Sequence, residues 1–194
     1  MPDDAPAGAA DAPLGDARWR LVRITRRGVG MTFATAAFWL AMAGVAAFAG
    51  LDAARLGLFL VIGGVLVYPL GFVLDRALGG DLSARGSEFR GLIGAITAGQ
   101  MLGWPVIVAL LITRVELVAF ALATMLGVHF LPYGWLYRTP AYWALGVAAV
   151  LVASTLQALW PSGANVTVPA SMALLHAAAA AAVWRQNRRE RVAA

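Results

Sequence analysis

The chain alternates between long apolar runs and short polar connections from about residue 31 onwards. Six apolar runs lie at about 31–50, 57–74, 91–112, 116–137, 141–159 and 166–184. Each run is close to the roughly 17 to 25 residues that an α-helix needs to cross the apolar core of a membrane. The pattern therefore predicts an all-α fold, a polytopic membrane protein whose six transmembrane helices form a bundle over residues 31–184.

The two ends of the chain have a different character. Residues 1–17 are mostly Ala, Pro, Asp and Gly without a hydrophobic period, which predicts a disordered tail. Residues 18–30 interleave five arginines with apolar side chains, and we expect this basic segment to lie along the membrane surface. Residues 185–194 are expected to form a short basic tail in the cytoplasm, and we expect no soluble domain.

The composition agrees with a membrane protein. The chain is 61% hydrophobic and 13% charged, against about 45–50% apolar and about 25% charged residues in soluble domains. It contains no cysteine, which excludes disulfides, thiolate metal sites and thiol nucleophiles. All fifteen basic residues are arginine and alanine is abundant, a bias that suggests a bacterial source.

The arginines predict the orientation of the bundle. When they are assigned to the connections between the six runs, thirteen of the fifteen fall on the side that holds both termini. Cytoplasmic connections of membrane proteins are enriched in Lys and Arg, so we expect both termini in the cytoplasm, in the cytoplasmic membrane of a bacterium. The same placement explains the pI near 10.7 without nucleic acid, and we expect membrane lipids as the general partner.

Small residues recur at helical spacing in three of the runs. The stripes are Gly57, Gly64 and Gly71; Ala95, Gly99 and Gly103; and Ala173, Ala177 and Ala181. Small side chains allow helices to approach closely in lipid, where the usual hydrophobic drive is absent. The stripes therefore predict packing seams within the bundle, and a homodimer through one of them is the alternative.

Few polar side chains fall deep inside the runs. Gln100, His129 and His176 all lie within about 5 Å of the middle of their helices, at 1.5 Å per residue, and so share one level. Tyr133 lies one turn from His129 on the same face. Pro132 and Pro105 each remove a backbone donor near these side chains. This grouping predicts a polar pocket between the third, fourth and sixth helices that binds a ligand or relays a proton.

A structural reading of the same residues stays open. Each histidine, and Gln100, can instead make one hydrogen bond between helices. No carboxylate falls at mid-membrane depth, because Asp75 and the other acids lie in connections or at helix ends. Two histidines without a carboxylate make a poor metal site, and no hydrolase, P-loop or zinc-protease motif is present. We expect no metal, no cofactor and no catalytic residue that the sequence identifies.

Three segments carry a resemblance to a known group of proteins: YPLGFVL, GQMLGWP and LGVHFLPYGWLYRTPAYW. Their most specific part is the His-x-Leu-Pro-x-x-Trp-Leu-Tyr core from His129 to Tyr137. The stretch from Tyr68 to about Leu145 resembles an uncharacterised bacterial family of small integral membrane proteins with a domain of unknown function. That pattern often has asparagine where this chain has Gly99. The resemblance implies a six-helix fold and no particular activity.

Three functional hypotheses follow. The first is binding or passage of a small molecule at a pocket formed by Gln100, His129, Tyr133 and His176. The second is a membrane-embedded enzyme that uses His129 and Tyr133, although no motif supports catalysis. The third is a structural or regulatory membrane subunit that works through its glycine stripes and the connection at residues 75–90.

Overall fold

A computed structural model of the chain describes the backbone of residues 11–192 and the side chains of residues 13–190. Throughout that part of the chain the only regular structure is helix. The α-helices are α1 Asp11–Thr25, α2 Val29–Phe48, α3 Ala53–Ala77, α4 Arg90–Leu102, α5 Trp104–Thr113, α6 Val118–Leu136, α7 Pro140–Leu159 and α8 Ala164–Val192; short 3-10 turns are η1 Arg26–Gly28, η2 Val115–Leu117 and η3 Pro161–Gly163.

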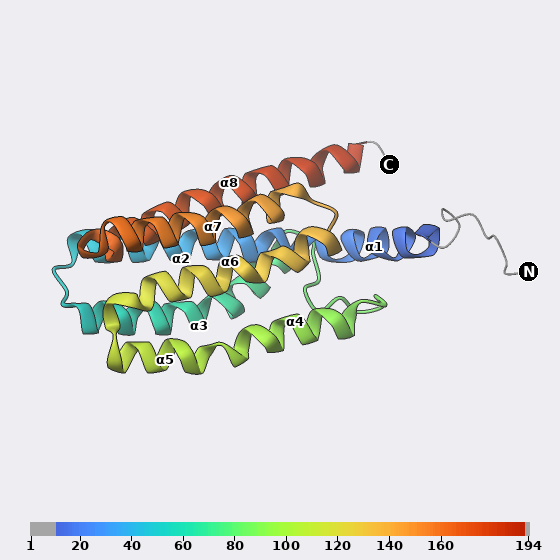
Figure 1. Ribbon diagram of the computed structural model, residues 1–194. Coiled ribbons are helices and arrows are strands. Elements are labelled where there is room, and N and C mark those ends of the chain that lie inside the picture. Colours follow the sequence, from blue (N-terminus) through green and yellow to red (C-terminus); the bar gives the residue numbers. More distant parts are fainter. Residues whose placement is uncertain (1–10, 193–194) are drawn as a thin grey trace, which may run out of the picture.

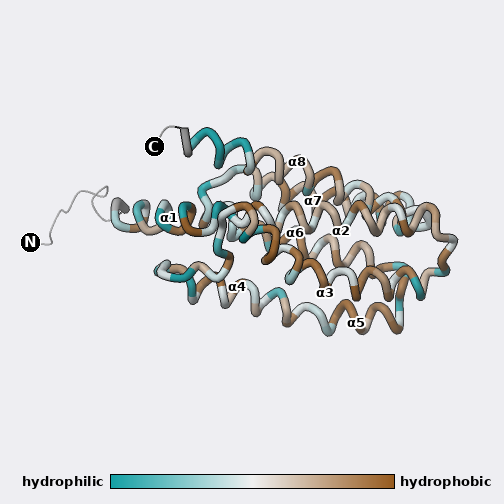
Figure 2. The backbone as a smooth tube through the Cα atoms, turned by 180° about the vertical axis from the view of Figure 1, so that it is seen from behind, coloured by the Kyte–Doolittle hydropathy of each residue, from teal (hydrophilic) through white to brown (hydrophobic). Residues whose placement is uncertain are grey.

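Six helices are long and apolar enough to cross a membrane, as the sequence predicts. They are Pro13–Phe48, Ala53–Ala77, Arg90–Thr113, Val115–Leu136, Pro140–Leu159 and Pro161–Glu190. The helices run side by side along one axis, and the beginning of α1 and the end of α8 project from the same end of the bundle (Figure 1). We call this the terminal end. Hydrophilic residues gather on α1, on the end of α8 and in the loop after α3 (Figure 2).

The N-terminal segment differs from the prediction. Residues 11–17, expected in a disordered tail, belong to α1, and Ala17, Leu21 and Val22 give that helix a buried face. The rest of the predicted tail, residues 1–10, lies outside the described residues. The basic segment 18–30 continues into α1, η1 and α2, and α1 runs roughly along the bundle axis instead of across it (Figure 1). A helix lying in the plane of a membrane would cross that axis.

A left-handed turn separates α1 from α2. Arg26, Arg27 and Gly28 have φ angles of 51°, 60° and 62°, which cost non-glycine residues roughly 1–2 kcal/mol each. The turn exposes carbonyls that side chains then satisfy: Asn187 donates to the carbonyl of Arg26 at 2.7 Å, and Tyr142 donates to that of Arg27 at 2.6 Å. Side chains from distant helices therefore help to hold the break.

The other spans match their predicted positions with two differences. The third span is divided at Gly103 into α4 and α5, next to Pro105, which cannot donate a backbone hydrogen bond. The sixth span is longer than predicted: α8 continues to Val192, so most of the predicted basic tail is helical. Asp52 begins α3 by accepting a hydrogen bond from the N–H of Arg55 at 2.8 Å.

The glycine stripe of α3 is a packing seam. A Cβ atom at Gly57 would meet Leu111 and Val115, one at Gly64 would meet Trp104, and one at Gly71 would meet Met31. These neighbours come from α5, η2 and α2, so α3 uses its glycines to admit side chains from both sides. The second stripe behaves differently, because Ala95 and Gly99 are exposed and a Cβ at Gly99 would meet no atom within 4 Å.

Candidate functional site

A cavity of about 510 Å³ lies among α2, α3, α4, α5 and α6. Its wall is mainly apolar and aromatic. The lining residues are Arg27, Gly28, Met31, Thr35, Gly64, Val65, Val67, Tyr68, Pro69, Leu82, Ile93, Thr97, Gln100, Met101, Trp104, Leu126, His129, Phe130, Tyr133, Tyr137 and Tyr142. Its size is within the range of about 300–1,000 Å³ typical of small-molecule sites.

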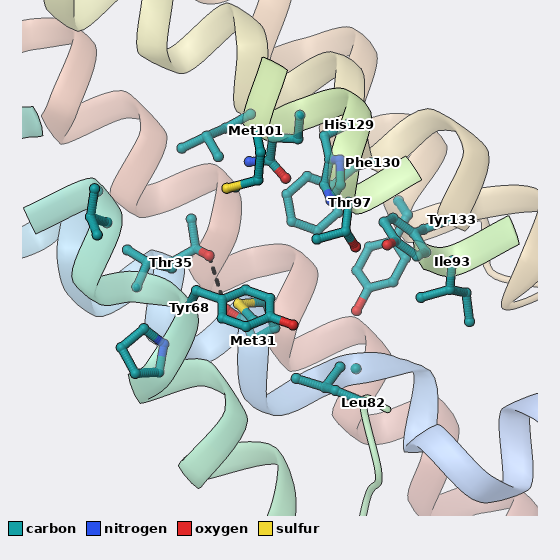
Figure 3. Close-up of a pocket in the computed structure, with 18 of the residues that line it drawn as sticks. Met31, Thr35, Tyr68, Leu82, Ile93, Thr97, Met101, His129, Phe130 and Tyr133 are labelled. Atoms are coloured by element: carbon teal, nitrogen blue, oxygen red, sulfur yellow. Dashed lines mark hydrogen bonds between the residues drawn. The ribbon is translucent and has the colours of Figure 1, made fainter. Parts of the chain in front are cut away.

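Three of the four residues that the sequence singles out line this cavity. Gln100 comes from α4, and His129 and Tyr133 come from α6. The rings of His129 and Tyr133 are 5.0 Å apart between centroids, as expected for residues one turn apart (Figure 3). Because α4 and α6 belong to different spans, the sequence could place these side chains at one depth but could not show that they share a wall.

His176 lies elsewhere. It is fully buried on α8, which contributes no lining residue to the cavity. Its Nδ1 is 2.7 Å from the carbonyl oxygen of Met172, one turn earlier on the same helix. Its ring packs on Phe130 with centroids 5.5 Å apart, so His176 stands behind a lining residue. The wall predicted from α8 is therefore provided by α2 and α3.

The polar groups of the cavity differ in whether they are already used. Thr35 donates its hydroxyl to the carbonyl of Met31 at 2.9 Å, and Tyr133 is hydrogen-bonded to the side chain of Thr97. By contrast, in the part of the chain whose side chains are described, neither the Gln100 amide nor the His129 imidazole has a hydrogen-bond partner. These two side chains are therefore polar groups of the wall that no other described protein group engages.

Hydrogen bonds and ring contacts hold the aromatic side chains of the cavity wall in place. Tyr142 donates to the carbonyl of Arg27 and lies 2.8 Å from the hydroxyl of Thr32. It packs on Phe130 with ring centroids 5.1 Å apart. Tyr133 and Tyr137 stack at 5.3 Å between centroids. The aromatic side chains are thus fixed by their neighbours and form a rigid surface.

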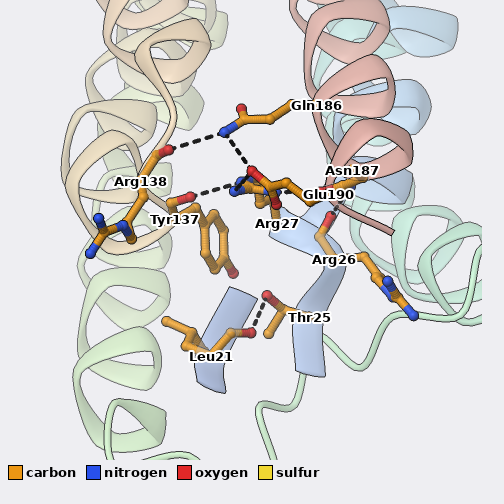
Figure 4. A network of polar contacts seen from close by, with 9 residues as sticks. All are labelled: Leu21, Thr25, Arg26, Arg27, Tyr137, Arg138, Gln186, Asn187 and Glu190. Atoms are coloured by element: carbon orange, nitrogen blue, oxygen red, sulfur yellow. Dashed lines mark hydrogen bonds and ion pairs between the residues drawn. The ribbon is translucent and has the colours of Figure 1, made fainter. Parts of the chain in front are cut away.

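A polar network lies at the terminal end of the cavity (Figure 4). The buried guanidinium of Arg27 donates through Nε to the carbonyl of Tyr137 at 2.9 Å, and through Nη1 to Asn187 at 2.7 Å. Its two terminal nitrogens also bind the carboxylate of Glu190, at 2.7 and 2.8 Å. This arrangement ties the α1–α2 turn to the end of α6 and to α8. We call these four residues the Arg27 network.

Sequence reasoning missed the contributions of α2 and α3 to the wall. Thr35 of α2 and Tyr68 of α3 line the cavity, and nothing in the sequence distinguishes them from residues that pack in the core or face lipid. Asp75 was also missed, because its position at the end of an apolar run suggested an exposed acid. It is fully buried, and its Oδ1 accepts a hydrogen bond from the N–H of Gly30 at 3.2 Å.

A comparison with protein-family models places the chain among known sequences. Residues 14–186 match the model of a family of unknown function, DUF7010. The chain belongs to the DUF7010 family. The match includes all residues that line the cavity and nearly all of the six spans. It covers much more of the chain than the stretch from Tyr68 to Leu145 that carries the resemblance seen in the sequence. No curated protein and no solved structure matches the chain.

Membership in DUF7010 supports the expectation of an uncharacterised domain family and brings no activity with it. The geometry of the cavity is therefore the guide to function. Among residues 13–190, no three His, Asp or Glu side chains gather in a way that could hold a metal ion. Arg27 is the one formally charged side chain among the lining residues, and the Arg27 network engages it.

Proposed function

We propose that this DUF7010 protein is an integral membrane protein that binds a small molecule in the cavity, as a step in its storage or passage across the bilayer. Gln100, His129 and Tyr133 form its polar contacts. The distribution of arginines supports an orientation with the terminal end in the cytoplasm of a bacterium.

One observation carries this proposal. Gln100 and His129 both reach a cavity of about 510 Å³ from different spans, and neither has a protein partner among the side chains described. Unpaired polar groups within a protein cost about 1–3 kcal/mol each in mutational data. Polar side chains at membrane depth usually mark a ligand or ion pathway. A ligand that accepts from one and donates to the other removes that cost.

The contact between the rings of His129 and Tyr133 is the observation that favours the enzyme hypothesis. An acid–base pair needs a group that orients the imidazole, and no carboxylate is among the lining residues. Tyr133 is also engaged by Thr97. Binding therefore accounts for more of the observed arrangement than catalysis does.

Native mass spectrometry tests the proposal. The wild-type protein is released from membranes in mild detergent beside Gln100→Leu and His129→Ala, with Gln157→Leu as the matched control. Gln157 lies on α7 and is not among the lining residues. We expect a bound small molecule in the wild type and the control that is lost from both cavity variants.

Two results would contradict the proposal. One is a set of bare spectra from all four proteins after gentle release. The other is a bound molecule that the cavity variants retain as well as the control does, which would place its site elsewhere on the chain.

A further inference from the structure

We infer that the cavity takes a neutral, lipid-soluble molecule bearing a carbonyl or hydroxyl group, and that this molecule enters from the lipid side between α3 and α4. The inference rests on the proposed binding function and adds the ligand class and the route of access. Four features of the cavity carry it: its charge, its free polar groups, its apolar wall and the position of its opening.

The charge of the wall favours a neutral ligand. Arg27 is the one charged lining residue, and its side chain is fully buried between Tyr137, Asn187 and Glu190. Glu190 pairs with this guanidinium at 2.7 Å and balances its charge, so Arg27 offers no uncompensated positive charge to a ligand. A charged molecule at membrane depth needs an opposite charge or water to replace its hydration. The cavity wall supplies neither a carboxylate nor a free cation.

The free polar groups define what the ligand carries. The Gln100 amide has two donor hydrogens and an acceptor oxygen, and a neutral imidazole such as that of His129 has one donor and one acceptor. A carbonyl accepts from either group, and a hydroxyl both donates and accepts. Because the two side chains come from α4 and α6, one oxygen held between them would link two spans.

The remaining wall suits an apolar body. Leu126 and Phe130 of α6, Met31 of α2 and Val65 of α3 line the cavity, and Trp104 adds a large flat surface. Figure 3 shows the sulfur of Met31 and the rings of Tyr68 and Phe130 directed toward the same space. Aromatic and methionine side chains give a large contact area to hydrocarbon without requiring hydrogen bonds.

Both ends of the cavity are packed. At the terminal end, Tyr137 and Tyr142 are held by the Arg27 network and by the carbonyl of Arg27. At the other end, Trp104 packs on α3: a Cβ atom at Gly64 would lie 2.8 Å from its Cη2. An aqueous route along the bundle axis would have to displace these groups.

Exposed lining residues lie on the side of the cavity that α3 and α4 form. Val65, Tyr68 and Met101 line the cavity and are 56%, 52% and 45% exposed. They come from α3 and α4, and Ile93 is the one buried residue of α4. The break at Gly103 separates this loosely packed helix from α5. These positions form a window toward the lipid.

The test uses two photoreactive probes that share one apolar body and differ in whether the alcohol is free or phosphorylated. Purified protein is reconstituted in lipid nanodiscs and exposed to a diazirine- and alkyne-bearing farnesol, or to the same compound as its monophosphate. Adducts are mapped by peptide mass spectrometry. We expect the alcohol to label peptides of α3 and α4 around Tyr68 and Met101, and the monophosphate to label them about tenfold less. We expect Gln100→Leu to reduce labelling by the alcohol by about tenfold, the effect of one hydrogen bond, and Gln157→Leu to leave it unchanged.

The outcomes separate this inference from the proposed function. Equal or stronger labelling by the monophosphate overturns the neutral class. Labelling by the alcohol that is confined to the Arg27 network and the loop after α3 overturns the lateral route. Absence of Gln100-dependent labelling, while native mass spectrometry still detects a cavity-dependent ligand, overturns the ligand class and leaves the binding function standing. Absence of both signals overturns the two together.

Discussion

Gly30 and Gly44 lie on the same helix, α2, and an alanine at each is expected to have opposite effects. A Cβ atom at Gly30 would overlap backbone atoms of Leu74 and Asp75 on α3. No atom lies within 4 Å of a Cβ at Gly44. The substitution is chemically identical at both sites, so the helix propensity that alanine adds is shared and the difference reports the contact between α2 and α3.

The magnitudes follow from that contact. Overpacking at a tight site costs about 1–3 kcal/mol, and separation of the helices also lengthens the bond from the Gly30 N–H to Asp75. Alanine at an open helical position adds about 0.5–1 kcal/mol relative to glycine. Because both variants gain this propensity, they should differ by the overpacking cost alone, about 1–3 kcal/mol, or about 2–12 °C in Tm for a chain of this size.

The assay is thermal unfolding in detergent, followed by circular dichroism at 222 nm and by loss of the monodisperse peak in size-exclusion chromatography. We expect Gly30→Ala to unfold below the wild type and Gly44→Ala at or above it. Equal Tm values for the two variants, or a Gly30→Ala protein as stable as the wild type, would refute the close approach of α2 and α3 and with it the α3 wall of the cavity.

Three further predictions concern other parts of the chain. Glu190→Gln should lower stability by about 1–3 kcal/mol, because it leaves buried Arg27 without its counter-charge. Glu116→Gln, which removes an exposed ion pair, should leave Tm unchanged. Equal effects of the two substitutions on Tm would contradict the Arg27 network. Hydrogen bonds from Ser83 lower the pKa of Asp81, so ionised Asp81 stabilises the loop above about pH 4, the usual Asp pKa. That contribution disappears as the pH falls through the lowered pKa. The Tm difference between wild type and Asp81→Asn should therefore shrink on acidification. If the exposed small-residue face of α4 forms a homodimer, Gly99→Leu should convert dimers to monomers in analytical ultracentrifugation, whereas an unchanged mass distribution would remove that interface.

The spans were predictable because each is specified locally. An apolar run of sufficient length determines a membrane-crossing helix regardless of its neighbours, and the runs at 57–74 and 141–159 correspond closely to α3 and α7. The end of an apolar run is less well determined. Leu14, Ala17 and Leu21 give α1 a helical period among polar residues, and this signal is too weak to outweigh the Ala, Pro and Asp composition before it.

The site was predictable only in part, because it depends on which helices are neighbours. Depth along a helix can be counted from the sequence, and that count brought Gln100 and His129 to one level. Counting depth cannot show whether α8 or α3 forms the wall that faces these two side chains. His176 matched the depth criterion and nevertheless bonds its own helix at Met172. Tyr68 and Trp104 line the cavity because α3 packs beside α5 at Gly64, a contact between distant segments.

The burial of the Arg27 guanidinium was the other feature that the local sequence pattern could not predict. Arg27 belongs to a run of arginines that reads as a solvated membrane anchor, yet it is the arginine whose side chain is fully buried among those described. Its burial depends on Asn187 and Glu190, about 160 residues later in the chain. A left-handed turn and a distant acid therefore convert an interfacial residue into part of the core.

The most direct measurement is an experimental density map of the protein in nanodiscs made from its native membranes. We expect non-protein density in the cavity, in contact with Gln100 and His129 and extending toward the window between Val65 and Met101. A cavity filled by repacked side chains, with the Gln100 amide and the His129 ring bonded to protein groups, would contradict it.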